Sequence, residues 1–484
     1  MTIERITLAP GLDISRVLTG LWQIADLERD GAVLDPGKTG AAMAPYVAAG
    51  FTTFDLADHY GSAEDLVGAF RESHPEAASA TFFTKWVPKP GPVSLDEVRS
   101  AVDRALTRMK ASRIDLLQFH AWNYADPGWL DALFHLAELR RDGLIRHLGV
   151  TNFDTAHLRI AVASGIPIVS NQVSFSLLDQ RAAGAMSAYC RESGVKLLAY
   201  GTVAGGWLAA KWLARPEPDW EKTGTWSQMK YGRFLRTTGG WAGLQRILIA
   251  LDAVARRHGV SVTNVATRSI LDQPAVAGVI IGARLGESQH IADNARLFDF
   301  ALSADDRDEI DAAVATLDPI PGDTGDEYRK PPYLTASGDL SHHLTDVPLP
   351  YTTQPGLGGK TLCLSGTTWE TAAGFSRAVR IGDRVLISGT TATHGSRPIG
   401  GSDPAAQAHF VIDKLEGALS SLGSRLDQVV RTRVYVRDLA DWEAVARAHG
   451  ERFTAIRPAN TLVRADLVGE GYLVEIEAEA VVSG

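Results

Sequence analysis

Eight short, mostly apolar segments recur along the first 318 residues and alternate with amphipathic stretches. Continuous apolar character over about four to eight residues is typical of strands that are buried on both faces. Eight such strands, each followed by a helix or loop, favour a (β/α)8 TIM barrel of the α/β class. A doubly wound sheet is the alternative, but no glycine-rich phosphate turn follows the first segment. The predicted strands are residues 16–23, 51–57, 81–87, 114–120, 147–152, 168–175, 195–200 and 276–281.

Local signals predict where several of the intervening helices begin and end. Ser94 followed by Glu97 is a capping-box pattern, which predicts a helix that continues to about Lys110. The amphipathic stretches 129–142 and 245–258 are followed by Gly143 and Gly259. Glycine directly after a helical pattern is typical of a helix C-terminus, so both stretches are predicted to end there.

Residues 319–350 interrupt this alternation. They contain six prolines and little periodicity, which indicates either a linker or a tail wrapped over the surface. We therefore expect a barrel over 1–318, a proline-rich linker over 319–350 and a second domain over 351–484. In this domain, strands and helices in mixed order predict an α+β fold with helices on one face of a sheet. The predicted strands are 384–388, 429–436, 461–467 and 472–482, and the predicted helices are 405–422 and 439–453.

Composition excludes several classes of protein. The net charge of −9 and the absence of a clustered basic run argue against a nucleic-acid-binding protein. Cys190 and Cys363 are the only cysteines, which excludes a disulfide scaffold and fits a reducing compartment. No apolar run approaches the roughly 18 residues that a membrane span needs. Because the first residues also lack the apolar core of a signal peptide, we expect a cytoplasmic protein that binds no membrane.

Four polar residues stand at or just after predicted strand ends: Asp55, Tyr60, Lys85 and His120. Taken singly, each has a structural explanation: Asp55 could cap the following segment and Tyr60 could belong to the core. Lys85 could be a surface charge, and His120 could be a buried imidazole with its hydrogen bonds satisfied. Together they favour an active site, because the loops after barrel strands build such sites and a buried lysine and aspartate are costly unless paired. An ammonium lowers the pKa of a nearby phenol, a carboxylate holds the ammonium, and an imidazole can position a substrate oxygen. The set predicts a general acid for carbonyl reduction, or a general base for alcohol oxidation.

The stretches around these residues resemble the three catalytic signatures of the aldo-keto reductase family: FDLADHYG, TKW at 84–86 and DLLQFH at 115–120. GVTNF at 149–153, NQVSFSLLDQ at 171–180 and VIIGAR at 279–284 are also similar to family segments and follow the family's order over residues 5–318. The resemblance implies a nicotinamide cofactor, usually NADP(H) with NAD(H) possible. It implies hydride transfer involving an aldehyde, ketone or sugar, with Tyr60 as proton donor, Asp55 and Lys85 tuning it, and His120 orienting the carbonyl.

The same resemblance implies roles around the cofactor. Asn152 and Gln172 match residues that hold the nicotinamide amide, and Phe175 stands where the family has a tyrosine stacked on the ring. Arg284 stands where a basic residue grips a 2′-phosphate, with a solvated loop charge as the alternative. RLGESQHIADN is about two residues longer than the commonest family form, which leaves the Gln289 assignment and the choice between NADP and NAD open. The implied cofactor-contacting positions are Gly20, Trp22, Asp55, Asn152, Gln172, Phe175, Gly201, Thr202, Gly282, Arg284, Gln289 and Asn294.

Tryptophans suggest the character of the substrate pocket. Trp22, Trp86 and Trp122 fall in loops at the expected barrel mouth, and large apolar side chains with a few polar groups are typical of ligand pockets. Five more tryptophans lie in the long segment after the seventh strand, where packing of that segment onto the barrel is an equally good explanation. They are Trp207, Trp212, Trp220, Trp226 and Trp241.

The C-terminal domain resembles a second family. VLISGTTAT (385–393), LGSRLDQVVRTRVYVRDLADWEAV (422–445), RPANTLV (457–463) and VEIEAEAVV (474–482) are similar to segments of the Rid/YjgF (RutC-like) family over residues 370–484. This resemblance implies a chorismate-mutase-like α+β fold and a homotrimer with clefts between subunits. Active members hydrolyse enamines and imines, and they hold the substrate carboxylate with the arginine of a P-x-R-[ST] motif.

In this chain Asn460 occupies the position of that arginine. A neutral amide cannot form the bidentate ion pair of a guanidinium, which argues against ordinary 2-imino-acid deamination. Arg464 lies on the same strand face and would substitute only in a remodelled cleft. Ser388 and Glu477 match the family's cleft serine and acidic residue, with Glu475 as a rival, and a strand carboxylate paired with an arginine is an equal alternative for Glu477.

Three functional hypotheses remain. The first is an NADP-dependent oxidoreductase acting on a small-molecule carbonyl or alcohol, whose C-terminal domain forms a trimer or binds a ligand. The second is a bifunctional reductase and imine or enamine deaminase, which Asn460 disfavours. The third is a non-catalytic, nicotinamide-binding regulatory protein, which the intact set of Asp55, Tyr60, Lys85 and His120 disfavours.

Overall fold

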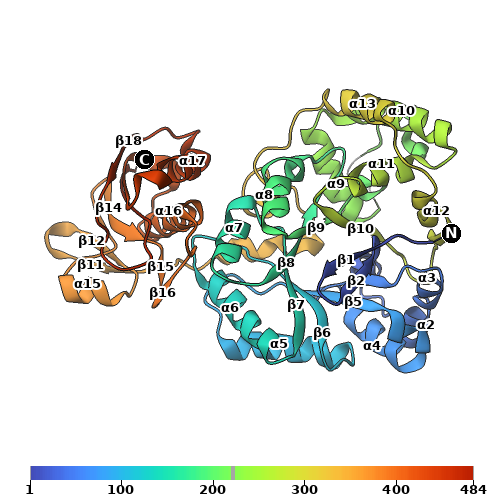
Figure 1. Cartoon of the computed structure of the whole chain (residues 1–484), viewed down its shortest axis with the longest axis horizontal. Coiled ribbons are helices and arrows are strands. Elements are labelled where there is room, and N and C mark those ends of the chain that lie inside the picture. The colour runs from blue at the N-terminus through green and yellow to red at the C-terminus, as the bar shows by residue number, and fades with distance from the viewer. Residues whose placement is uncertain (1, 220–223, 483–484) are drawn as a thin grey trace.

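The N-terminal part of the chain forms a closed barrel of eight parallel strands (Figure 1). The computed structural model describes residues 2–219 and 224–482. The barrel order is β10-β3-β4-β5-β6-β7-β8-β9, which confirms the predicted (β/α)8 fold. All eight predicted segments contain a barrel strand, but the first is shorter than expected because α1 already begins at Trp22. The strands are β3 (Val17–Gly20), β4 (Thr53–Asp55), β5 (Thr81–Trp86), β6 (Ile114–Phe119), β7 (Ile145–Thr151), β8 (Ile168–Ser174), β9 (Lys196–Tyr200) and β10 (Val276–Gly282).

A hairpin closes the amino-terminal end of the barrel. Its strands β1 (Arg5–Ala9) and β2 (Leu12–Ser15) pair antiparallel and precede β3. Leu8, Leu12 and Ile14 of the hairpin join an apolar cluster with barrel residues such as Phe83 and Leu116. The sequence prediction missed this hairpin, because its two strands are short and only partly apolar.

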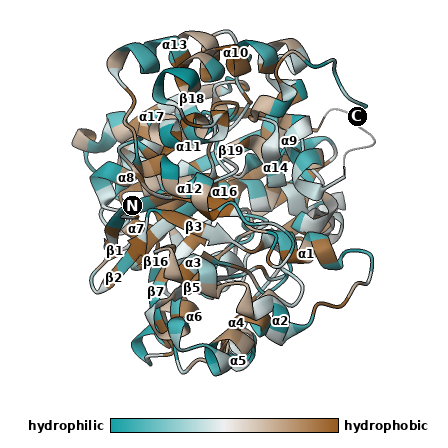
Figure 2. Ribbon diagram, turned by 90° about the vertical axis from the view of Figure 1, so that its right-hand side faces the viewer, coloured by the Kyte–Doolittle hydropathy of each residue, from teal (hydrophilic) through white to brown (hydrophobic). Residues whose placement is uncertain are grey.

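The helices surround the barrel and largely follow the predicted signals. In α5 the Ser94 hydroxyl accepts a hydrogen bond from the Glu97 N–H, and the helix ends before Lys110, whose φ of 50° is left-handed. Gly143 and Gly259 take positive φ values after α6 and α10, as predicted. α10 and α13 carry hydrophilic and hydrophobic residues together, as amphipathic helices do (Figure 2). The helices of this part are α1 (Trp22–Glu28), α2 (Pro36–Ala41), α3 (Ala44–Ala48), α4 (Ala63–Ser73), α5 (Leu95–Arg108), α6 (Gly128–Arg141), α7 (Thr155–Ala163), α8 (Ala185–Ser193), α9 (Trp226–Thr237), α10 (Gly240–His258), α11 (Val262–Leu271), α12 (Ile291–Ala295) and α13 (Ala304–Val314).

The C-terminal unit is built on a seven-stranded sheet in the order β11-β12-β13-β14-β19-β17-β18. Helix α16 packs on one face of this sheet, and α17 packs on α16, which confirms the predicted α+β class. Three strands and α15 at the start of the unit were not predicted, because they are short and mostly exposed. The elements are β11 (Thr352–Pro355), β12 (Thr361–Leu364), α15 (Thr368–Ala373), β13 (Ala378–Ile381), β14 (Arg384–Thr391), β15 (Thr393–His394), β16 (Arg397–Pro398), α16 (Pro404–Ser421), β17 (Val429–Val436), α17 (Trp442–Phe453), β18 (Ala459–Arg464) and β19 (Val474–Val481).

The segment 319–350, which we call the strap, contacts the surface of the barrel. It contains α14 (Asp326–Arg329). Arg329 of α14 donates hydrogen bonds to the carbonyl oxygens of Ala121 (2.9 Å) and Asn152 (2.8 Å), and Glu327 forms an ion pair with Arg181 (2.8 Å). These buried contacts fix the strap to loops at the carboxyl ends of the barrel strands.

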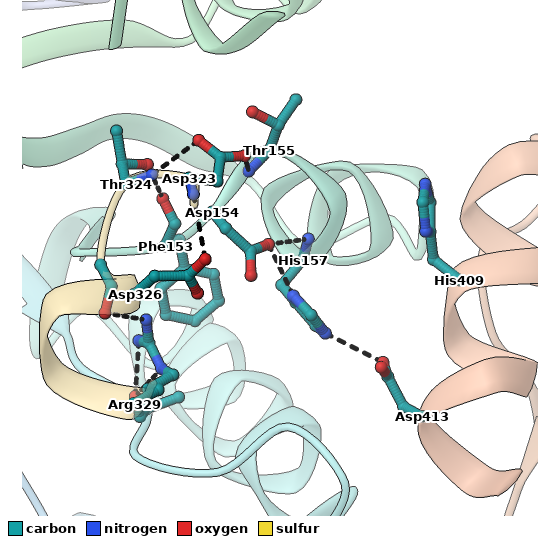
Figure 3. A network of polar contacts seen from close by, with 12 residues as sticks. Phe153, Asp154, Thr155, His157, Asp323, Thr324, Asp326, Arg329, His409 and Asp413 are labelled. Carbon is teal, nitrogen blue, oxygen red and sulfur yellow. Dashed lines mark hydrogen bonds and ion pairs between the residues drawn. The ribbon is translucent and has the colours of Figure 1, made fainter. Parts of the chain in front are cut away.

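A buried ionic network joins the two units where α7 packs on α16 (Figure 3). His157 of α7 contacts Asp154 through Nδ1 (2.6 Å) and Asp413 of α16 through Nε2 (3.0 Å). Arg452 of α17 donates to the other oxygen of Asp413 (2.6 Å). Burial alone would lower the pKa of His157, but Asp154 and Asp413 outweigh burial and raise that pKa. The network therefore favours the charged form of the imidazole between the two carboxylates.

Among the described residues, no helix combines the length and the apolar character that crossing a membrane requires.

Candidate active site

A cleft of about 490 Å³ opens at the carboxyl ends of the barrel strands, and the four predicted catalytic residues all line it. Asp55 ends β4, Lys85 lies on β5, His120 directly follows β6, and Tyr60 lies in the loop after β4. Parallel strands bring their carboxyl ends to one rim of a barrel, which explains how residues distant in sequence meet here.

The Lys85 and Asp55 side chains form a buried ion pair with a distance of 2.6 Å between Nζ and Oδ2. Lys85 also donates to the carbonyl oxygen of Leu56 (2.9 Å). The amides of Gln118 and Gln172 donate to the other oxygen of Asp55 (3.0 and 2.7 Å). Burial lowers the pKa of Lys85, and Asp55 opposes that shift. A pair bonded this completely can remain charged in the barrel interior.

Tyr60 packs beside this pair. Lys85 Nζ lies 4.9 Å from the centroid of the Tyr60 ring, and Trp22 and His59 pack against the ring at 5.1 and 4.8 Å. Burial raises the pKa of Tyr60 well above its ordinary value, and Asp55 adds to this shift. The ammonium of Lys85 does not offset these effects, so the net shift is opposite in direction to the one expected from sequence. The phenol is therefore protonated at neutral pH and can donate its proton.

His120 supplies an unused polar atom to the cleft. Its side chain is buried, and Nε2 has no hydrogen-bond partner among the described residues. Burial lowers the pKa of His120 well below its ordinary value, and Arg329 adds to this shift. An unpaired polar atom in a buried site is costly, and a neutral imidazole that carries its proton on Nε2 can donate a hydrogen bond to a ligand oxygen.

Most of the residues predicted to contact a cofactor also line the cleft. Arg284 already forms ion pairs with Asp26 (3.3 Å) and Glu287 (2.9 Å). Gly201 has a φ of 74°, and a Cβ at this position would clash with Tyr231, so the loop backbone approaches its neighbours as only glycine allows. The predicted positions that line the cleft are Gly20, Trp22, Asp55, Asn152, Gln172, Gly201, Thr202, Gly282, Arg284 and Asn294.

Three predicted positions lie elsewhere. Phe175 is fully buried in the core and is not part of the cleft wall, so its predicted stacking on a nicotinamide does not fit the structure. The aromatic residue that lines the cleft here is Tyr200, the last residue of β9, whose hydroxyl donates to Asn152 Oδ1 (2.7 Å). Gln289 is exposed outside the cleft wall. Trp86 ends β5 and turns into the core against Phe119 (5.7 Å).

Of the predicted tryptophans, Trp22 and Trp122 line the cleft. Trp226 packs on Trp22 at 5.7 Å. Trp207, Trp212 and Trp241 form a separate packed cluster with ring distances of 4.7 to 6.1 Å, which supports the packing explanation for them. Trp220 lies outside the described residues.

The sequence prediction missed several polar residues of the cleft wall. The rule that found Asp55 would also have found Tyr200, because both residues end a barrel strand. Lys230 on α9 and Tyr328 and Asp339 on the strap also line the cleft. No local pattern marks these three, because long irregular segments bring them to the barrel mouth.

The three predicted cleft residues of the C-terminal unit are engaged with their own neighbours. The Ser388 hydroxyl donates to the Ser376 carbonyl oxygen (2.8 Å), and Asn460 Nδ2 donates to Thr432 Oγ1 (2.9 Å). Glu477 is paired with Arg433, the arrangement expected if this strand carboxylate is structural. Their roles as cleft residues stay predictions.

Comparisons with known proteins agree with this geometry. The model of the aldo/keto reductase family matches residues 16–315, and that of the endoribonuclease L-PSP family matches residues 366–482. The chain is 40% identical to an uncharacterised protein of Streptomyces coelicolor over 121 residues, which are 24% of this chain and 87% of that protein. It is 30% identical to the protein Tas of Escherichia coli over 250 residues, which are 47% of this chain and 68% of that protein. The structure of a glycerol dehydrogenase from Gluconobacter oxydans shares the barrel fold at 23% identity, with a TM-score of 0.55 over 66% of this chain and 97% of that one.

Proposed function

Since the chain belongs to the aldo/keto reductase family and is an oxidoreductase of that type, we propose that its barrel interconverts a carbonyl and an alcohol with NADP(H) and with Tyr60 as proton donor. One observation carries the proposal: a protonated Tyr60, the Lys85–Asp55 pair and the free Nε2 of His120 line the same cleft. The second domain matches the model of the endoribonuclease L-PSP family over residues 366–482, and we assign it a role in assembly.

In the reductive direction, a bound nicotinamide supplies a hydride to the carbonyl carbon. His120 Nε2 binds the carbonyl oxygen and fixes its position. Tyr60 donates its proton to this oxygen as negative charge develops on it. The Lys85 ammonium, close to the ring, then stabilises the phenolate until it is reprotonated. In the oxidative direction the phenolate acts as the base.

Residues of the cleft wall suit the two ends of the cofactor. Asn152 and Gln172 would hold the nicotinamide amide, and Tyr200 replaces Phe175 as the aromatic residue beside the ring. Thr202, Arg284 and Asn294 would hold the phosphates and the adenosine. Arg284 would bind a 2′-phosphate only by sharing its guanidinium with Asp26 and Glu287, and a guanidinium has enough donors for such sharing.

The purified full-length protein should oxidise NADPH in the presence of small aldehydes, ketones or sugars, as followed by the absorbance of reduced nicotinamide. We expect the KM for NADPH to be about tenfold lower than that for NADH, because a charge-assisted hydrogen bond contributes about 1.5–3 kcal/mol. An equal or lower KM for NADH would contradict the NADP assignment. Cofactor binding without oxidation by any carbonyl would instead favour the regulatory hypothesis.

For the C-terminal domain we propose trimerisation through the open face of its sheet. Helix α16 covers one face, while the other exposes Leu386, Val463 and Val481 among charged side chains such as Arg384 and Glu479. Exposed apolar side chains gathered on one sheet face are typical of an interaction surface.

Light scattering should give a mass of about three times the chain's 52.0 kDa. The substitution Leu386→Glu should shift the particle towards the monomer, because it places a charge on the open face. Leu357→Glu is the matched control, since Leu357 is 93% exposed outside the sheet centre. A monomeric wild-type protein, or an equal effect of both substitutions, would contradict this assembly.

Both cysteines, Cys190 and Cys363, are free and buried, and we propose the cytoplasm as the compartment because reduced thiols persist there.

A further inference from the structure

The strap forms part of the cleft wall beside the catalytic residues. Tyr328 and Asp339 of the strap line the cleft and face Lys230 of α9. Tyr328 and Asp339 lie outside both ranges matched by the family models, 16–315 and 366–482. This polar group, which we call the roof (Lys230, Tyr328 and Asp339), therefore contains two residues that neither family model covers.

The strap is held tightly enough to fix the roof. A Cβ at Gly325, whose φ is 82°, would clash with the carbonyl oxygen of Asn152. A Cβ at Gly338 would clash with the Trp226 ring, and Trp22 lies 2.9 Å from the same point. Arg329, which follows Tyr328 in the sequence, donates hydrogen bonds to the carbonyl oxygens of Ala121 and Asn152. The backbone on both sides of the roof thus contacts residues of the cleft directly.

The hydrogen bonds of the roof leave the proton of the Tyr328 hydroxyl available to a ligand. Lys230 Nζ donates to the Tyr328 hydroxyl oxygen at 2.6 Å. The Tyr200 hydroxyl donates its own proton to Asn152. Among the described residues, the Tyr328 proton meets only the Tyr200 oxygen, at the long distance of 3.4 Å. A ligand oxygen in the cleft would offer this proton a better acceptor.

This donor lies near the atom that binds the carbonyl. The Tyr328 ring meets the His120 ring edge-on at 5.3 Å and the Trp122 ring at 6.2 Å. A substrate whose carbonyl oxygen is held by His120 Nε2 therefore lies close to the Tyr328 ring. A small substrate can reach both groups at once.

The charges around the cleft favour a neutral substituent. Three Lys and Arg side chains of the described residues line the cleft, and each is paired with a carboxylate of the same wall. The pairs are Lys85–Asp55 (2.6 Å), Lys230–Asp339 (3.5 Å) and Arg284–Asp26 (3.3 Å). A substrate carboxylate or phosphate beside the roof would meet Asp339 as well as Lys230, whereas a hydroxyl group meets no like charge.

We propose that Tyr328, held by Lys230, is a positioning residue that binds a hydroxyl group next to the carbonyl of a neutral hydroxylated aldehyde or ketone. This inference rests on the proposed carbonyl chemistry of the barrel and adds the substrate class. The phenol donates to the substrate hydroxyl while the ammonium keeps the phenol oriented, and the carbonyl stays with His120 and Tyr60.

Glyceraldehyde and propanal test this inference, because they are three-carbon aldehydes with and without hydroxyl groups. In the full-length enzyme, Tyr328→Phe should raise the KM for glyceraldehyde about tenfold, change kcat less than threefold and leave the KM for propanal unchanged. Tyr333→Phe is the control, since Tyr333 lies on the same strap and is 51% exposed. A thermal melt of each variant checks that the strap remains folded.

A binding measurement separates this inference from the proposed function. The Kd of glyceraldehyde for the enzyme loaded with oxidised cofactor, from an NMR titration, should also rise about tenfold in Tyr328→Phe. If glyceraldehyde binds with this difference in Kd but the wild type does not reduce it, the result supports the inference and contradicts the proposed reductase activity. If the wild type reduces both aldehydes and Tyr328→Phe raises the KM for both equally, or for neither, the inference is overturned and the proposed function is not. A wild type that reduces propanal but neither binds nor reduces glyceraldehyde would overturn the inference and leave the proposed function standing.

A second variant tests the part of the inference that concerns charge. Asp339→Asn removes the negative charge from the roof and preserves the shape of the side chain. It should increase the preference for glyoxylate, which carries a carboxylate next to its aldehyde, over glyceraldehyde by at least about fivefold. A wild type that already prefers glyoxylate would overturn the neutral substrate class.

Discussion

Replacing Tyr60 by phenylalanine should lower kcat for carbonyl reduction by about 1,000-fold, because the general acid contributes roughly 10²–10⁴-fold in such reactions. The substitution removes only the hydroxyl and keeps the ring against Trp22, His59 and the Lys85 ammonium. The Kd of the cofactor should therefore change less than about twofold.

Turnover would be followed by the absorbance of reduced nicotinamide and cofactor binding by its fluorescence, with Tyr333→Phe as the exposed control. Loss of cofactor binding together with turnover would assign Tyr60 a structural role instead.

The pH dependence of the rate gives a second test of the role of Tyr60. Because burial raises the pKa of Tyr60 above 10.0, reduction should stay constant through neutral pH and fall only in the alkaline range. Alcohol oxidation, which needs the phenolate, should rise with pH.

Replacing Asp413 by alanine should destabilise the junction between the two domains by about 3–5 kcal/mol, the usual consequence of breaking a buried ion pair. The change leaves Arg452 with Glu416 alone and leaves His157 with Asp154 alone. We expect the amides of α7 and α16 to exchange hydrogen faster by a corresponding factor, as measured by mass spectrometry in the native state.

A matched control lies at the same junction. Arg159 and Asp403 join α7 to the start of α16 at 2.9 Å, but both side chains are about one quarter exposed. Because solvent screens such a pair, Arg159→Gln should cost less than about 1 kcal/mol. This change keeps Asp403, whose side chain caps the start of α16. Equal exchange rates in the two variants would contradict a dominant role for the buried network.

The pH dependence of this junction follows from the two pKa shifts. The pKa of His157 is raised, so its contribution to stability is complete below its ordinary 6.5 and is lost as the pH rises through the raised value. The pKa of Asp413 is lowered, so its contribution is complete above its ordinary 3.8 and is lost as the pH falls through the lowered value. The wild-type junction should weaken in the alkaline range, and Asp413→Ala should reduce that dependence.

The barrel and the four residues proposed to act in catalysis could be located from sequence because both leave local signals. Strands that are buried on both faces have continuous apolar sequences, and polar residues at their ends, such as Asp55 and Lys85, stand out from those sequences. The direction of one side chain leaves no such signal. Phe175 and Tyr200 both stand at the ends of predicted strands, so the strand-end rule selects both. Only the packed structure shows that Tyr200 lines the cleft while Phe175 is buried in the core.

The roof could not be predicted for a different reason. Tyr328 and Asp339 lie in a proline-rich segment without periodicity, and their neighbours in space come from distant parts of the chain. Likewise, His157 and Asp413 belong to two helices whose patterns show only that each has a buried face. Contacts between separate units depend on docking, which short sequence windows do not record.

The position of the strap constrains any attempt to separate or recombine the two modules. A reductase cut at residue 318 would leave behind a piece of its own binding pocket, so proteolysis of this connection would change substrate preference instead of releasing an intact enzyme. For the same reason, a graft of this barrel onto another partner must carry the connecting segment along with it.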